Sequence, residues 1–167
     1  LNVKHGDEII LPSYTFVSTA NAYALYGAKL VFADSRSDHP GIDENRLEKL
    51  ISPNTKAIVV VHYAGMAVDM DKIMDLADKY NLFVIEDAAQ AMGSKFRQKE
   101  VGNFGDFAVF SLVKSIYSLA GAFLTHKKES PLSVIMKEKF GFIPTMYKVM
   151  KRYLESKSSV SSILYTN

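Results

Sequence analysis

One short segment of the chain, Lys56–Val61, is apolar at every position after its first lysine. A strand with one solvent-exposed face alternates apolar and polar side chains, whereas a strand buried on both faces is apolar almost throughout. Residues 56–61 therefore predict an interior strand of a sheet that is covered on both sides. Sheets of this kind are mostly parallel, because the helices that connect parallel strands form the two covering layers.

The rest of the sequence alternates short apolar runs with amphipathic stretches. Amphipathic spacing predicts three helices, at residues 15–26, 43–51 and 70–80. Gly27 is expected to end the first helix and Asp43 to begin the second. Apolar runs predict further strands at residues 7–11, 29–32, 82–85, 107–110 and 121–124. This order of elements predicts an α/β fold with a mostly parallel sheet sandwiched by helices.

Polar and aromatic side chains follow several predicted strands at their carboxyl ends. In α/β folds, ligands bind just beyond the carboxyl ends of parallel strands. The residues at these positions are Phe16, His62, Asp87, Gln90, Ser111 and Lys114. An aromatic ring, an imidazole, a carboxylate, an amide, a hydroxyl and an amine are therefore predicted to meet at one edge of the sheet, where they form a candidate functional site.

Four segments near this edge carry a more specific pattern. They are GDEIILPSYTFVSTANA at residues 6–22, VVHYAG at 60–65, VIEDAAQA at 84–91, and the stretch from Gly102 to Ser111. In this order and spacing they resemble the DegT/DnrJ/EryC1/StrS family of sugar aminotransferases, which depend on pyridoxal 5′-phosphate (PLP). The resemblance implies the fold of the large domain of a type I PLP-dependent transferase, here truncated, with residues 1–126 as its PLP-binding core.

The resemblance also implies a role for each of five residues. Asp87 would lie beside the pyridine nitrogen of PLP and keep it protonated, because a nearby carboxylate favours the charged form. Phe16 would stack on the cofactor ring. Gln90 would lie near the phenolic oxygen, and Ser111 would help to bind the phosphate. Lys114 would hold PLP as a Schiff base and carry the proton between cofactor and substrate.

Some of these residues also have a purely structural interpretation. Asp87 at the end of a strand could merely cap a turn, and an aromatic residue such as Phe16 often belongs to the core. A histidine that closes a buried strand, as His62 does, is more often structural than catalytic. The chain has no cysteine, which excludes disulfides and thiolate sites, and we expect no metal site.

The segment after Ser111 departs from the family pattern. The family usually places more residues between the serine and the lysine, and its glycine-rich run is reduced here to residues 119–122. A shortened loop would move the Lys114 amine, and a displacement of about 1 Å can cost on the order of 100-fold in rate. Three interpretations stay open: a subfamily with a compensated loop, a relative that uses PLP differently, or an inactive copy.

Residues 127–167 differ in composition from the rest of the chain and form a predicted basic tail. They contain eight Lys or Arg against three Asp or Glu, a net charge of +5 against −3 for residues 1–126. Apolar residues at helical spacing predict two amphipathic helices. Their simplest interpretation is a packed pair with a solvated basic face. The alternatives are contact with a nucleotide-diphosphate substrate or with an anionic membrane surface.

Two parts of the family pattern have no counterpart in residues 1–167. The serine-glycine-threonine element that holds phosphate at a helix N-terminus belongs upstream of Gly6, and the smaller C-terminal domain belongs downstream. We therefore expect this sequence to be a fragment or a truncated form. The resemblance further implies a homodimer, because members of this family commonly work as dimers.

The predicted function is transfer of an amino group, with glutamate as the expected donor, to the keto group of a nucleotide-linked deoxysugar. One alternative is a PLP-dependent sugar dehydratase, against which Lys114 argues. Another is an inactive truncated homologue that acts as a binding or membrane-surface module. No apolar run approaches the roughly 20 residues needed to span a bilayer, and no signal pattern begins the chain, so a cytoplasmic location is expected. The net charge of +2 gives no indication of nucleic-acid binding.

Overall fold

A six-stranded sheet forms the centre of the computed structural model, which describes residues 1–115 and 121–126. The strand order is β2-β1-β3-β4-β7-β8. The strands are β1 (Glu8–Pro12), β2 (Lys29–Ala33), β3 (Thr55–Val61), β4 (Phe83–Asp87), β7 (Phe107–Ser111) and β8 (Ala122–His126). The first five pair in parallel, and β8 pairs antiparallel to β7. The predicted α/β class with a mostly parallel sheet is confirmed.

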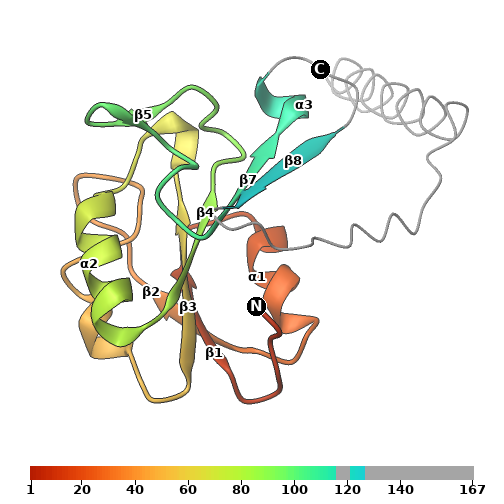
Figure 1. The fold of residues 1–167 in the computed structure, drawn as a ribbon, viewed down its shortest axis with the longest axis vertical. Coiled ribbons are helices and arrows are strands. Elements are labelled where there is room, and N and C mark those ends of the chain that lie inside the picture. Colours follow the sequence, from red (N-terminus) through yellow and green to blue (C-terminus); the bar gives the residue numbers. More distant parts are fainter. Residues whose placement is uncertain (116–120, 127–167) are drawn as a thin grey trace, which may run out of the picture. The chain divides into compact units, whose positions relative to one another are not determined.

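Helices cover the two faces of this sheet, as Figure 1 shows for α1 on one side and α2 on the other. The helical elements are α1 (Val17–Ala24), α2 (Met70–Tyr80), α3 (Leu112–Ser115) and the 3-10 turns η1 (Leu47–Leu50) and η2 (Tyr63–Gly65). A small antiparallel hairpin, β5 (Lys95–Phe96) with β6 (Lys99–Glu100), lies outside the main sheet. The sequence patterns did not predict this hairpin, because its strands are only two residues long.

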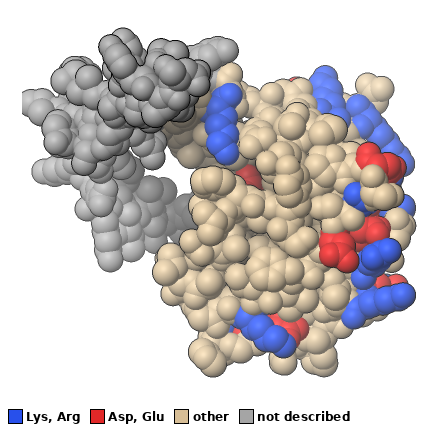
Figure 2. Space-filling view, turned by 180° about the vertical axis from the view of Figure 1, so that it is seen from behind, with Lys and Arg blue, Asp and Glu red and all other residues tan. Residues whose placement is uncertain are grey.

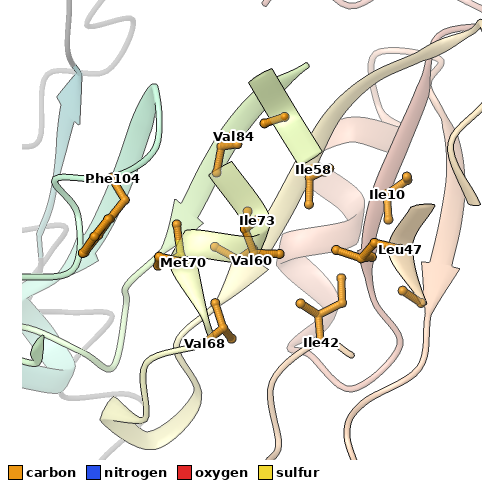
Figure 3. Packing of buried hydrophobic residues seen from close by; sticks show 12 residues of the cluster. Ile10, Ile42, Leu47, Ile58, Val60, Val68, Met70, Ile73, Val84 and Phe104 are labelled. Carbon is orange, nitrogen blue, oxygen red and sulfur yellow. The ribbon is translucent and has the colours of Figure 1, made fainter. Parts of the chain in front are cut away.

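The side chains of the central strands alternate between the two faces of the sheet. Ile10 of β1 belongs to the cluster that packs under α2, whereas Ile9 and Leu11 belong to the cluster on the side of α1. Figure 3 shows the first cluster, in which side chains from the strands meet those of α2 and of the loops before it. In β3, every residue of 57–61 is buried, which confirms the predicted interior strand.

The covering of the α1 face leaves an open apolar cavity of about 460 Å³. Its lining includes Tyr23 and Tyr26 from the α1 segment and Phe107, Val109 and Leu124 from β7 and β8. Figure 2 shows a broad area without Lys, Arg, Asp or Glu side chains in the middle of one face of the protein, with charged side chains mostly along the right-hand edge of the view and a few at its top and bottom.

The predicted helix at residues 43–51 is wrong. Only the short turn η1 forms there, and Asp43 does not cap it. Instead, Asp43 Oδ1 accepts a hydrogen bond from the backbone N–H of Asn45, 3.2 Å away, which closes a turn. The next side chain, Glu44, is buried and accepts from the backbone N–H of Asp69 at 2.9 Å. These two contacts hold the segment in a non-helical path.

The helix predicted at residues 70–80 is confirmed as α2 with the same bounds. Asp69 caps its first turn by accepting from the N–H of Lys72, and Asn81 ends it in the left-handed conformation, with φ of 53°. The α1 helix is shorter than the predicted 15–26, and the chain leaves it through a turn to Gly27, whose φ of 82° suits glycine.

The predicted tail at residues 127–167, with its two amphipathic helices, lies outside the described residues. Within residues 1–115 and 121–126, no helix has both the length and the apolar character needed to cross a membrane.

Candidate functional site

A cavity lies beyond the carboxyl ends of β3 and β4, where the sequence predicted a site. Its lining includes four of the predicted site residues: Phe16, Asp87, Gln90 and Lys114. His62 also lines it, together with Thr15, Ser18, Thr19, Val61, Tyr63 and Ala89. Ser111 is the last residue of β7, paired with Ala122 of β8, and it is not part of this lining.

Phe16 and Lys114 face each other across this cavity. Phe16 precedes α1 and its side chain is 65% exposed, so the ring is available to a planar ligand. The Lys114 Nζ lies 5.6 Å from the centre of the Phe16 ring. This separation places an amine beside any planar group that stacks on Phe16.

Asp87 ends β4 and accepts two hydrogen bonds from other described residues. The Thr19 hydroxyl donates to Oδ2 at 2.7 Å, and the backbone N–H of Ala89 donates to Oδ1 at 3.2 Å. Asp87 therefore caps the turn after β4 and also lines the cavity. Burial, and secondarily the negative charge of Asp87, raise the pKa of the Tyr23 hydroxyl nearby.

The sequence patterns missed Thr19. A signal was present, because Thr19 lies three residues after Phe16 and so one helical turn away at the start of α1. The contact itself joins residues 68 positions apart, which no local pattern reports.

Gln90 connects the segments that follow β3 and β4. Its Oε1 accepts from the backbone N–H of Ala64 at 2.9 Å. Ala64 lies in η2 with φ of 52°, an unusual conformation for a residue with a Cβ. The Tyr63 ring in the same turn lies 4.7 Å from that of Tyr14, between ring centres. Gln90 thus holds one wall of the cavity in place.

His62, which lines the cavity, forms a fully buried pair with Glu86. The distance from His62 Nε2 to Glu86 Oε2 is 3.1 Å. The backbone N–H of Val68 points at His62 Nδ1, 3.4 Å away, so Nδ1 acts as the acceptor and Nε2 carries the proton donated to Glu86. Both ring nitrogens are engaged within the protein, which favours the structural interpretation of His62.

Glu86 also binds the loop that leads into β7. Its Oε1 accepts from the N–H groups of Phe104 (2.9 Å) and Gly105 (2.6 Å), and its Oε2 accepts from that of Gly102 (2.6 Å). Burial alone would raise the pKa of this carboxyl, but the bonds from His62 and the backbone outweigh it and hold the pKa below its ordinary value.

A comparison with known protein families identifies the chain. The model of the DegT/DnrJ/EryC1/StrS aminotransferase family matches residues 1–140. The chain belongs to the DegT/DnrJ/EryC1/StrS aminotransferase family.

Individual relatives from this family share about two fifths of the matched residues. The GDP-perosamine synthase of Caulobacter vibrioides is 44% identical over 66% of this chain and 30% of its own length. The UDP-4-amino-4-deoxy-L-arabinose–oxoglutarate aminotransferase of Shewanella sediminis is 40% identical over 84% of this chain and 36% of its own length. The chain therefore spans about a third of the length of these relatives.

A solved structure supports the same family fold. NtdA of Bacillus subtilis, with bound cofactor PMP, is 31% identical and superimposes with a TM-score of 0.68, over 77% of this chain and 29% of NtdA.

The shortened Ser111–Lys114 segment of this DegT-family chain is accommodated by α3. This single turn begins directly after β7, and the backbone N–H of Leu112 donates to the Gly121 carbonyl at 3.0 Å. Lys114 thereby reaches the cavity despite the spacing. Residues 116–120, which include part of the reduced glycine-rich run, lie outside the described residues.

Replacing Gly105 by alanine is expected to lower the free energy of unfolding by about 1–3 kcal/mol. A Cβ at this position would lie 2.8 Å from the Val84 carbonyl oxygen, so the loop would have to move away from Glu86. Chemical denaturation measures the change. Asn103→Ala, in the same loop but exposed, is the control, with an expected change within about 0.5 kcal/mol. Equal effects of the two substitutions would contradict the prediction.

Proposed function

We propose that this chain is the PLP-binding part of an aminotransferase that acts on a nucleotide-linked keto-sugar. The observation that carries the proposal is the meeting of Phe16, Asp87, Gln90 and Lys114 in one cavity of a DegT-family fold. Two relatives named for amino-sugar products, one of them an oxoglutarate aminotransferase, support a sugar acceptor and glutamate as the donor.

The residues around the cavity fit PLP by their chemistry. An exposed aromatic ring suits a planar pyridine, a carboxylate suits its ring nitrogen, and an amine suits its aldehyde. The Thr15 hydroxyl adds a buried polar atom that has no hydrogen-bond partner among the described residues. The bound PMP of NtdA, the amino form of the same cofactor, supports this assignment.

Bound PLP supplies an electron sink that stabilises negative charge on the substrate carbon. In this proposal Phe16 would orient the ring, and Asp87 would hold the ring nitrogen in its protonated form. Gln90 would supply a polar contact at the edge of the ring. Lys114 would hold the cofactor through Nζ and would serve as the base and acid for the proton of the substrate carbon.

The phosphate contact of Ser111 and the homodimer stay predictions of the family pattern, and the cytoplasmic location stays a prediction from the sequence patterns. The dehydratase alternative is less well supported, because that chemistry replaces the lysine that lies here beside Phe16. We therefore keep the aminotransferase as the proposed function.

Incubation with PLP followed by borohydride reduction is expected to label Lys114 selectively. Reduction makes the covalent link permanent, and peptide mass spectrometry then locates it. The matched variants are Lys114→Arg, which should lose the label, and Lys99→Arg on the exposed hairpin strand β6, which should keep it. A label spread over surface lysines, or no label, would contradict a PLP site in this chain.

A further inference from the structure

Thr19 is a buried residue of the site to which the family pattern above gives no role. It lies in the first turn of α1, with 9% of its surface exposed. Its hydroxyl donates to Asp87 Oδ2 at 2.7 Å, the shorter of the two hydrogen bonds that Asp87 accepts. A hydrogen bond to a charged acceptor contributes more than one between neutral groups, so this contact is a strong constraint on the carboxylate.

The surroundings of Asp87 explain why such a constraint matters. Asp87 lines the polar cavity and also a second, largely apolar cavity of about 210 Å³. The second lining includes Tyr23, Val59, Ile85 and Val109. Space on both sides leaves the carboxylate room to rotate, and the weaker contact from the Ala89 N–H holds only the other oxygen.

We propose that Thr19 is a positioning residue that fixes the side-chain orientation of Asp87 before the cofactor arrives. The hydroxyl anchors Oδ2 to α1, whose start also carries Phe16, so the ring platform and the carboxylate are held by the same helix end. A carboxylate already oriented does not have to be ordered when the ligand binds, which favours binding. The effect on cofactor binding rests on the proposed function, whereas the orientation of Asp87 by Thr19 does not.

Three variants of the full chain test this role. Thr19→Val removes the hydroxyl and keeps the shape, whereas Thr19→Ser keeps the hydroxyl. Thr55→Val is the matched control, because Thr55 is also 9% exposed and its hydroxyl accepts from the Ser52 N–H at 2.8 Å, at the opposite end of β3 from the cavity.

The first readout needs no cofactor. Three-bond scalar couplings measured by NMR report whether the χ1 angle of Asp87 occupies one rotamer or several. We expect one rotamer in the unmodified chain, in Thr19→Ser and in Thr55→Val, and averaging over rotamers in Thr19→Val. A single unchanged Asp87 rotamer in Thr19→Val would overturn the inference.

The second readout is the dissociation constant for PLP, measured by the change in cofactor absorbance. Thr19→Val is expected to bind about tenfold more weakly, equal to about 1.4 kcal/mol, with Thr19→Ser and Thr55→Val close to the unmodified chain. If the unmodified chain fails to bind PLP, the proposed function fails for this chain, and the Asp87 rotamer alone decides the role of Thr19. If PLP binds equally to all four proteins, the inference is overturned while the proposed function stands.

Discussion

Replacing Glu86 by glutamine is expected to lower the free energy of unfolding by about 3–5 kcal/mol. All four groups that contact the carboxylate are donors: the N–H groups of Gly102, Phe104 and Gly105, and His62 Nε2. A glutamine in either orientation would point its NH₂ at two of these donors and leave them unpaired. Since domains are stable by only about 5–15 kcal/mol, this loss is a large fraction of the total.

Urea denaturation, monitored by circular dichroism, measures this change in the free energy of unfolding. Glu48→Gln is the control, because Glu48 is half-exposed and its bonds to Lys79 and Tyr80 lie on the surface, where solvent screening keeps their contribution small. A loss for Glu86→Gln no larger than that of Glu48→Gln would show that the loop does not depend on the buried carboxylate.

The same contacts predict how acid affects the fold. The pKa of Glu86 is lowered in the folded protein, so its stabilising contribution is complete above its ordinary value of 4.5 and is lost as the pH falls through the folded pKa. The Glu86→Gln variant should therefore lose less stability than the unmodified chain when the pH is lowered below about 4.5.

Under the proposed function, replacing Asp87 by asparagine is expected to leave the fold intact and to lower the transamination rate of the PLP-loaded protein by about 100- to 1000-fold. The asparagine side-chain oxygen can still accept from the Ala89 N–H while its NH₂ donates to the Thr19 hydroxyl, which can also accept, so the contact to α1 is kept. The negative charge that the proposal places beside the ring nitrogen is lost, and removing one preorganised electrostatic group costs about that much in other enzymes.

Single-turnover transamination with glutamate, monitored by cofactor absorbance, measures the loss. Asp106→Asn is the matched control, because Asp106 accepts from the Val84 N–H at 2.9 Å at the beginning of β4, away from the cavity. If the Asp87→Asn variant reacts as fast as the control, the proposed role of Asp87 beside the ring nitrogen is contradicted.

The strands could be predicted from the sequence because the burial of a strand determines its local pattern of apolar residues. The continuous apolar run of β3 follows from burial on both faces, and α2 carries both a cap and a regular apolar stripe. The prediction of a helix at residues 43–51 was wrong, because the conformation of this segment depends on contacts with residues far away in the chain. Glu44 accepts a hydrogen bond from the backbone N–H of Asp69, and no local sequence pattern predicts this contact.

The candidate site divides in the same way. Phe16, Asp87, Gln90 and Lys114 were predicted to converge because parallel strands end at one edge, and all four line the cavity. The roles of Thr19 and Glu86 were not predicted, since both act through contacts between residues far apart in the chain. Adjacent residues on β4 point to opposite faces, so Glu86 serves the loop and Asp87 serves the cavity.

The order of the strands has a consequence for how the chain folds. The β7–β8 pairing is local, but β1 must join β3 across a long intervening segment before the walls of the cavity meet. Closing such loops is entropically costly and makes non-local sheets slow to assemble. Phe16 follows β1 and Lys114 follows β7, so the two sides of the cavity come from opposite ends of the described chain. A partly folded chain would therefore lack the site, and a ligand that needs both sides of the cavity would bind only after the whole sheet has formed.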